Sequence, residues 1–238
     1  MSSPRLHLDL ALAAGATLTL EGDRVHYLRN VLRLREGAQV RAFNAADGEW
    51  RARIAGSARH CLDLLVEDRL RAPLAEPGPT LVFAPIRRNR MEWLVEKAVE
   101  LGAGALVPVL TRRTVVRPEN PERLQAIAVE AAEQCERLTV PAVAAPVPLP
   151  LWLAARDPSV PLLFAEERGA GAPVLAAVRQ YPGAAILVGP EGGFAEDELA
   201  LLHAAPASTP ISLGRLILRA ETAALHALVA WQLAQTDA

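Results

Sequence analysis

The chain has 238 residues, of which 51% are hydrophobic and 4% aromatic, enough to bury the core of one large domain or two modest ones. Its formal net charge of −2 requires no polyanionic partner, and its two cysteines, Cys61 and Cys135, lack the CxxC spacing of a disulfide framework or a zinc site. Asp9 interrupts the apolar N-terminus and no uncharged apolar run of about 18 residues occurs, so we expect no signal peptide, no membrane span and a cytoplasmic location.

Residues 1–72 are predicted to form a small β-barrel. Four short segments have strand character: 16–20, 38–43, 49–55 and 60–67. The third contains EWRARI, where apolar and charged side chains alternate as in a half-buried strand. A helix is expected over about 23–34. Repeated short strands at this spacing, separated by turn residues, are typical of a barrel.

A Pro-rich segment, 71–79, is the predicted linker, and the pattern changes after it. Strands are expected at 80–86, 105–110, 160–165, 184–189 and 209–214, with helices near 88–102, 120–138 and after each later strand. This alternation predicts a second, α/β domain over 73–238, with a parallel sheet covered by helices on both faces. The Pro-rich segment 139–150 is expected to cross the surface with one short strand.

The run LVGPEGGFAEDEL, residues 187–199, places a glycine-rich loop directly after a predicted strand. Ligands bind at this end of the strands in open α/β sheets, although a tight turn without a ligand remains an alternative. Acidic residues surround the next helix start: Glu191, Glu196, Asp197 and Glu198. Because carboxylates oppose a pyrophosphate and no GxGxxG or GxxxxGK[ST] motif occurs, the loop favours an adenosine ligand without phosphate, such as S-adenosylmethionine.

A second loop, in ISLGRLILRAETAAL (211–225), has the same form. A strand ends near Gly214, an apolar triplet follows at 216–218, and a helix is expected to start near Ala220. The triplet can line an adenine pocket and offer its amides to the base edge, or it can be a buried connection. The residues alone leave both readings open.

Together these loops resemble the SPOUT class of methyltransferases. More narrowly, the chain resembles the RsmE-type family, which methylates N3 of a uridine in 16S ribosomal RNA. Three further blocks carry the resemblance: HYLRNVLRLREG (26–37), RMEWLVEKAVELGAGALVPVLTRRTVV (90–116) and VEAAEQCERLTVPAV (129–143). Five blocks in the family's order make the resemblance specific and extend it nearly from end to end.

The resemblance implies a PUA-type RNA-binding barrel, followed by an α/β domain whose chain forms a trefoil knot. It also implies a homodimer with the cofactor pocket near the subunit contact, S-adenosylmethionine as methyl donor, and no metal. In one departure, Leu216 stands where family members usually carry a basic residue. The expected cofactor-binding residues are Val188, Gly189, Pro190, Glu191, Gly192, Gly193, Leu213, Gly214, Leu216, Ile217 and Leu218.

Several arginines are candidates for binding the RNA. Arg29 and Arg33 share one arc of the predicted helix at 23–34, which could also be an ordinary solvated face. Cations at a helix start oppose the helix dipole, which suggests an RNA contact at the start of the helix near 88. The expected RNA-binding residues are Arg29, Arg33, Arg87, Arg88, Arg90, Arg113 and Gln134.

Three residues are candidates for catalysis. Arg219 and Glu221 follow the apolar triplet directly, and Arg137 shares a helical face with Glu130 and Gln134. In the hypothesis, Arg219 first and Arg137 second stabilise the anion that develops on the uracil oxygens, and Glu221 or Glu191 or water takes the proton. Two rival functions remain: a non-catalytic RNA-binding or ribosome assembly factor of the same fold, and an enzyme with a phosphate-bearing nucleotide cofactor.

Overall fold

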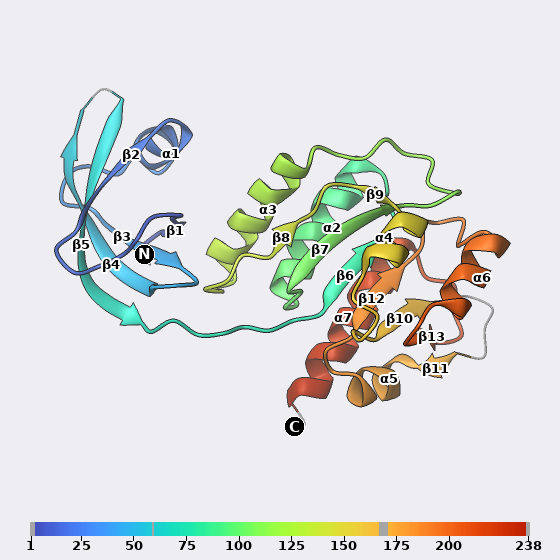
Figure 1. Ribbon diagram of the computed structural model, residues 1–238. Helices are drawn as coiled ribbons and strands as arrows, with labels where there is room; N and C mark the ends of the chain where they lie inside the picture. The colour runs from blue at the N-terminus through green and yellow to red at the C-terminus, as the bar shows by residue number, and fades with distance from the viewer. Residues whose placement is uncertain (1–2, 59, 167–170, 237–238) are drawn as a thin grey trace. The chain divides into compact units, whose positions relative to one another are not determined.

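The computed structural model describes residues 3–58, 60–166 and 171–236. The chain divides into two compact units (Figure 1). The first holds Met1–Glu76 and Ala132–Thr139, and the second holds Pro77–Ala131 and Val140–Ala238. The domain boundary expected at residue 72 stays a prediction. Residues 132–139, the return segment, belong to the first unit although they lie far from its other residues in the sequence. Such long-range contacts cannot be predicted from a local sequence pattern.

The first unit is a curled five-stranded sheet in the order β1-β3-β4-β5-β2. Its strands are β1 (Arg5–His7), β2 (Thr17–Glu21), β3 (Gln39–Asn44), β4 (Gly48–Ser57) and β5 (Cys61–Arg71). β1 pairs with β3 in parallel, and the other neighbours are antiparallel. The small β-domain expected at the N-terminus is confirmed. The three residues of β1 are too few for their pattern to have predicted a strand.

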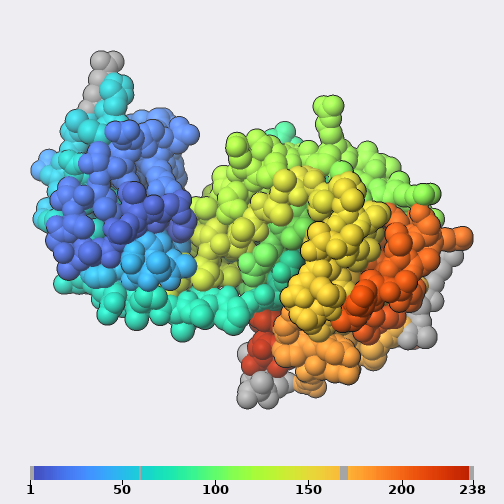
Figure 2. All heavy atoms as spheres, viewed as in Figure 1, coloured from blue at the N-terminus to red at the C-terminus, as the bar shows by residue number. Residues whose placement is uncertain are grey.

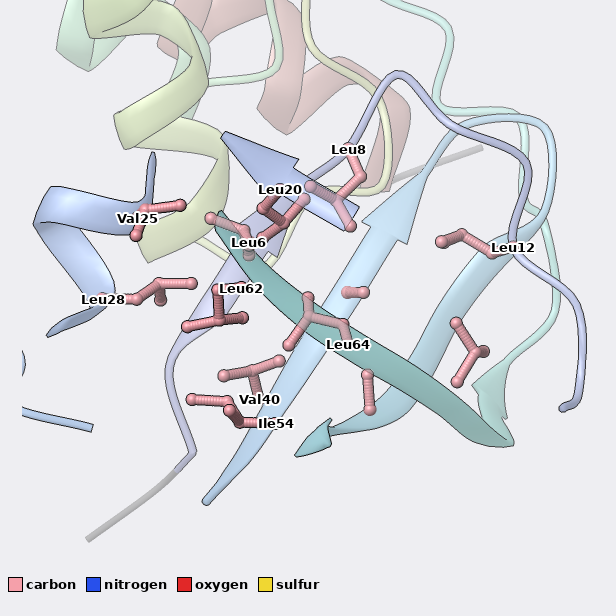
Figure 3. Close-up of a cluster of buried hydrophobic side chains, with 13 residues drawn as sticks. Leu6, Leu8, Leu12, Leu20, Val25, Leu28, Val40, Ile54, Leu62 and Leu64 are labelled. Carbon is pink, nitrogen blue, oxygen red and sulfur yellow. The ribbon is translucent and has the colours of Figure 1, made fainter. Parts of the chain in front are cut away.

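Alternation along these strands builds the core of the first unit. In β4, Ala52 and Ile54 are buried, whereas Arg51 and Arg53, which alternate with them, are only half-buried. Figure 3 shows Ile54 gathered with Val40 and Leu62 from the neighbouring strands. Each such side chain stabilises the fold by roughly 1.5–3 kcal/mol when it is fully buried.

The helix expected over 23–34 is shorter than predicted. It consists of α1 (Asp23–His26) and one π-helical turn, η1 (Tyr27–Val31). Val25 and Leu28 point into the core of the first unit, which explains the helical periodicity. Arg33 has a φ of 54°, and this left-handed conformation prevents the helix from continuing.

The second unit contains a parallel sheet in the order β11-β13-β10-β12-β6-β7-β8, with β9 pairing to β7. Its strands are β6 (Thr80–Phe83), β7 (Ala105–Leu110), β8 (Ala142–Val143), β9 (Val147–Pro148), β10 (Leu162–Ala165), β11 (Ala172–Pro173), β12 (Ala185–Val188) and β13 (Ser208–Ser212). Its helices are α2 (Arg88–Glu100), α3 (Pro121–Gln134), α4 (Leu149–Ala155), α5 (Val174–Gln180), α6 (Glu196–Ala204) and α7 (Ala220–Thr236), and the end of α3 belongs to the first unit. The α/β class is confirmed, and the trefoil knot stays a prediction.

Helices cover both faces of this sheet. On one face, α4 and α6 pack over side chains such as Val82, Phe164 and Leu187, and Figure 2 shows these two helices side by side. On the other face, α7 packs on β12 and against α2 and α5. Successive strand residues point to opposite faces, so the near-continuous burial of β10 and β12 requires both layers.

Two helix ends show how local residues set the element lengths. α2 buries Met91, Leu94 and Val95 on one stripe and ends before Gly102, whose φ of +88° allows the left-handed turn that stops a helix. α3 ends at Gln134, earlier than the predicted residue 138, because Glu136 adopts a φ of 65°.

Candidate functional site

A pocket of about 300 Å³ lies at the carboxyl ends of the strands in the second unit. In the sheet, β10 lies between β12 and β13, so the loops after these three strands converge. The lining residues are Val188, Gly189, Pro190, Gly192, Gly193, Phe194, Glu196 and Leu199 after β12; Leu213, Gly214, Arg215, Leu216, Ile217, Leu218, Ala220 and Ala223 after β13; Ala165 and Glu166 at the end of β10; and Arg113 after β7. Both glycine-containing loops that the sequence singled out therefore face one cavity.

The loop after β12 is a tight turn with its backbone close to the cavity. The Gly193 amide donates to the Pro190 carbonyl at 2.8 Å, and Gly193 has a φ of 69° that favours glycine. A Cβ on Gly189 would lie 3.1 Å from the Phe194 ring, so this position also has little room for a side chain. Of the expected residues in this loop, Val188, Gly189, Pro190, Gly192 and Gly193 line the pocket and Glu191 does not.

The acidic residues around this loop have different roles. Glu198 is 3% exposed, and its two carboxylate oxygens accept from the amides of Arg112 at 2.8 Å and Ala195 at 2.9 Å. Asp197 pairs with the Arg112 guanidinium at 3.0 Å. These two acids hold the start of α6 to the loop after β7. Glu196 faces the pocket, and so does Glu166, which the sequence analysis missed.

The loop after β13 supplies an apolar wall. Leu216, Ile217 and Leu218 all line the pocket, as expected for the triplet. Leu216 is 80% exposed and Ile217 is 83% exposed, so the alternative of a buried connection is wrong for these two side chains. The cavity is therefore open on the side that this loop forms.

Arg113, one of the expected RNA contacts, lies at the pocket. It lines the pocket, and its guanidinium donates to the Gly192 carbonyl at 2.7 Å. The side-chain stem lies against Gly192, where an added Cβ would be 3.4 Å from Arg113 Cδ. Arg113 thus fixes the carbonyl of the glycine-rich turn, and an RNA role for it stays a prediction.

Glu166 directly follows β10, the middle one of the three strands whose loops form the pocket. Its backbone amide donates to the Ile211 carbonyl of β13 at 3.2 Å. Its carboxylate Oε2 lies 3.3 Å from His203 Nε2 of α6. The only sequence signal was a position, the first residue after the apolar run 162–165, and such positions line ligand sites in parallel sheets.

Arg219 and Glu221, the two catalytic candidates after the second loop, have different surroundings. Arg219 is exposed next to Leu218 and Ala220, which both line the pocket. Glu221 is buried on another side of α7, and its Oε1 lies 3.3 Å from an Arg90 guanidinium nitrogen on α2. Glu221 Oε2 is buried without a hydrogen-bond partner among the described residues.

Two other expected RNA contacts in the second unit lie at the start of α2. Arg88 pairs with Glu92 at 3.1 Å and lies 3.7 Å from Glu119, whereas Arg87 is exposed directly before the helix. No acidic residue occupies the first turn of α2. The cations at this end therefore still oppose the helix dipole, and their RNA role stays a prediction.

In the first unit, Arg29 and Arg137 are tied to nearby groups. Arg29 donates to the Ala58 carbonyl at 2.6 Å and to the Ser57 hydroxyl, which attaches the π-helical turn to the β4–β5 hairpin. Arg137 is 9% exposed and donates to the Thr139 hydroxyl at 3.0 Å, and burial lowers the pKa of its guanidinium. Arg33 and Gln134, the latter at the end of α3, are exposed.

The part of the chain that the structure describes shows neither a metal cluster nor a membrane-spanning helix. Among residues 3–58, 60–166 and 171–236, no cluster of three or more His, Cys, Asp or Glu side chains is placed to hold a metal ion. In that same part of the chain, no helix has both the length and the apolar character needed to cross a membrane.

Comparisons with known proteins agree with this geometry. Residues 76–232 match the model of an RNA methyltransferase domain, and residues 20–66 match that of an RNA methyltransferase PUA domain. The ribosomal RNA small subunit methyltransferase E of Rickettsia conorii is 34% identical over 96% of this chain and 94% of its own. That of Synechocystis is 36% identical over 90% of this chain and 72% of its own.

Solved structures give the same picture. The crystal structure of a ribosomal RNA small subunit methyltransferase E from Neisseria gonorrhoeae bound to S-adenosyl methionine matches with a TM-score of 0.87, at 30% identity and 98% coverage of both chains. A putative methyltransferase from Legionella pneumophila in complex with the same cofactor matches with a TM-score of 0.84, at 26% identity and 98% coverage of both chains. The chain therefore belongs to the RNA methyltransferase family whose members include the small-subunit ribosomal RNA methyltransferases E.

Proposed function

We propose that the protein transfers a methyl group from S-adenosylmethionine to N3 of a uridine in 16S ribosomal RNA. The observation that carries this proposal is the pocket at the carboxyl ends of β10, β12 and β13. It has the size of a nucleoside-derived ligand site, an apolar wall and two carboxylates, Glu166 and Glu196. The apolar wall fits an adenine and the carboxylates fit a cationic ligand, whereas of the two lining arginines Arg113 already donates to the Gly192 carbonyl and Arg215 is exposed.

The chain's residues fit this cofactor in distinct ways. The triplet 216–218 offers the adenine an apolar wall, and the glycines of the turn at 189–193 bring backbone groups to the cavity. The bound cofactor supplies an electrophilic methyl group on a sulfonium. Leu216, the departure from the family pattern, contacts a ligand through apolar surface, so the missing basic side chain leaves this adenine wall intact.

Uridine N3 carries an imide proton, and the nitrogen lone pair is available only when that proton leaves. In the proposed mechanism, Arg219 at the pocket mouth donates hydrogen bonds to the uracil oxygens and stabilises their developing negative charge. Holding the two reactants in line supplies much of the remaining rate enhancement. Arg137 stays the second choice for this donor. Glu221 stays a candidate proton acceptor, although its carboxylate pairs with Arg90 in this structure.

For the RNA, we propose that the exposed Arg33, Arg87 and Gln134 contact the substrate directly. Arg29, Arg88 and Arg90 already bind neighbouring groups, so they contribute RNA contacts only with the N–H groups that remain. We also propose a cytoplasmic homodimer. The exposed Leu216 and Ile217 support it, because large apolar side chains at a pocket rim are typical of surfaces that a partner covers.

Mass spectrometry of 16S ribosomal RNA from a strain that lacks the protein tests the function. The proposal expects one methyl group to be missing from a uridine and to return with the wild-type gene. A strain that carries Arg219→Ala should not regain it, although the purified variant should bind S-adenosylhomocysteine like wild type. Unchanged RNA methylation in the deletion strain, with cofactor binding absent from the pure protein, would instead favour the non-catalytic RNA-binding factor. Light scattering of the purified chain tests the dimer.

A further inference from the structure

Glu166 holds a central place in the pocket. β10 lies between β12 and β13, and the loops after those two strands form the opposite walls of the cavity. The bond from the Glu166 amide to Ile211 fixes its backbone at the end of the sheet, so its side chain starts from a rigid position between the two walls. A rigid strand end positions a functional group more accurately than a loop does.

Neighbouring side chains restrict the orientation of the Glu166 carboxylate. The side chain is 16% exposed, and Oε2 lies 3.3 Å from His203 Nε2. The His203 ring meets the buried Phe164 ring edge-on at 5.1 Å, which restricts the imidazole. Within the described residues, His203 takes one acceptor site of Oε2, so the other site of Oε2 and both sites of Oε1 are left for hydrogen-bond donors in the cavity.

The geometry points to a specificity role: we propose that Glu166 accepts hydrogen bonds from the vicinal hydroxyls of the cofactor's ribose. This inference rests on the proposed function. A carboxylate presents adjacent acceptor sites that match two neighbouring hydroxyls. An acidic residue beyond a parallel strand binds a ribose in the same way in dinucleotide-binding sheets.

This role also predicts that the pocket rejects nucleotides with a phosphate on a ribose hydroxyl. A phosphate on either ribose hydroxyl would bring a second negative charge against Glu166, and the repulsion grows as the site loses water. Two other acidic residues at the start of α6 are already paired: Asp197 with the Arg112 guanidinium, and Glu198 with the backbone amides of Arg112 and Ala195. Rejection of a 2′- or 3′-phosphate therefore depends on Glu166, with the exposed Glu196 as the other carboxylate of the pocket.

Calorimetric binding tests the proposal without any turnover. The probes are S-adenosylhomocysteine, 5′-methylthioadenosine and 2′-deoxy-5′-methylthioadenosine, which differ in the amino-acid group and in one hydroxyl. Glu166→Gln keeps the side-chain shape and loses the charge. Because hydrogen bonds to charged groups are stronger than those between neutral groups, Glu166→Gln should weaken the binding of S-adenosylhomocysteine and of 5′-methylthioadenosine by about 10- to 100-fold. The loss on the deoxy ligand should be at least several-fold smaller.

Glu196→Gln is the matched control, since it removes one negative charge from the same pocket at an exposed position. It should change the affinities for 5′-methylthioadenosine and its deoxy analogue by the same factor, because Glu196 does not contact the ribose hydroxyls. Circular dichroism confirms that both variants fold.

Three results would overturn the inference. Equal losses on the ribose and deoxyribose ligands would mean that Glu166 supports only the shape of the pocket. A loss confined to S-adenosylhomocysteine would mean that Glu166 binds its ammonium group. Failure of the wild-type protein to bind S-adenosylhomocysteine at all would refute the proposed function as well, which separates the two failures.

Discussion

Replacing Glu49 by Gln should destabilise the first unit more than any exposed charge substitution there. Glu49 is fully buried, and three guanidinium groups surround its carboxylate: Arg5 at 3.1 Å, Arg41 at 3.3 Å and Arg71 at 3.2 Å. Arg5 in turn donates to three backbone carbonyls of the segment 132–137. This network holds the return segment of the chain to the sheet.

The expected loss of stability follows from the negative charge, which Gln does not carry. Removing one partner of a buried ion pair costs about 3–5 kcal/mol, because the other charge stays buried without compensation. The Arg5 side chain is 2% exposed, but its three carbonyl bonds survive the substitution, so we expect the lower end, about 3 kcal/mol. For a chain of this length, that loss lowers the melting temperature by about 6–12 °C.

The assay is thermal unfolding by circular dichroism, together with hydrogen exchange of the amides in 132–139. Asp68→Asn is the control, because the Arg51–Asp68 pair at 3.0 Å is exposed and such pairs contribute about 0–1 kcal/mol. Exchange in 132–139 should accelerate in Glu49→Gln and stay unchanged in the control. If Glu49→Gln melts and exchanges like Asp68→Asn, the reasoning about this buried network is wrong.

Three other changes have expected outcomes. Gly193→Ala places a side chain at a φ of 69°, which costs about 1–2 kcal/mol. Calorimetry should therefore find that the variant binds S-adenosylhomocysteine about tenfold more weakly than the wild type does. Gly183→Ala is the control and should bind normally, because an added Cβ there meets open space. Burial lowers the pKa of His7, so the free energy of unfolding should decrease as the pH drops below about 6.5, where the unfolded chain binds the proton more readily. In urea titrations at several pH values, His7→Gln should show a weaker dependence of this free energy on pH than the wild type. Equal dependences would contradict the prediction. Glu221→Gln breaks the ion pair with Arg90, whose side chain is partly exposed. In thermal melts the variant should therefore lose only about 1 kcal/mol of stability. A much larger loss would mean that Glu221 is structurally essential.

Features that depend on neighbouring residues could be read from the sequence. The alternation in EWRARI predicted a strand, and the structure has β4 there. The strand followed by glycine-rich residues at 187–193 predicted a ligand loop, and that loop lines the pocket. Such features follow from side-chain periodicity and glycine's conformational freedom, which act within a few residues.

Features that depend on strand order could not be read in this way. Glu166 and the GPEGG loop meet because β10 lies between β12 and β13, an order that no periodicity encodes. The partners of Glu198 and of Arg113 come from other elements, so no local pattern shows that Glu198 holds the Arg112 amide or that Arg113 holds the Gly192 carbonyl.

The sequence by itself determined the two-part architecture and the positions of the two ligand loops, because both arise from short-range patterns that survive in any environment. The tertiary structure alone decided which charged groups face the pocket. Burial and pairing across distant segments assign each carboxylate and guanidinium its partner, and those partners come together only when the sheet forms.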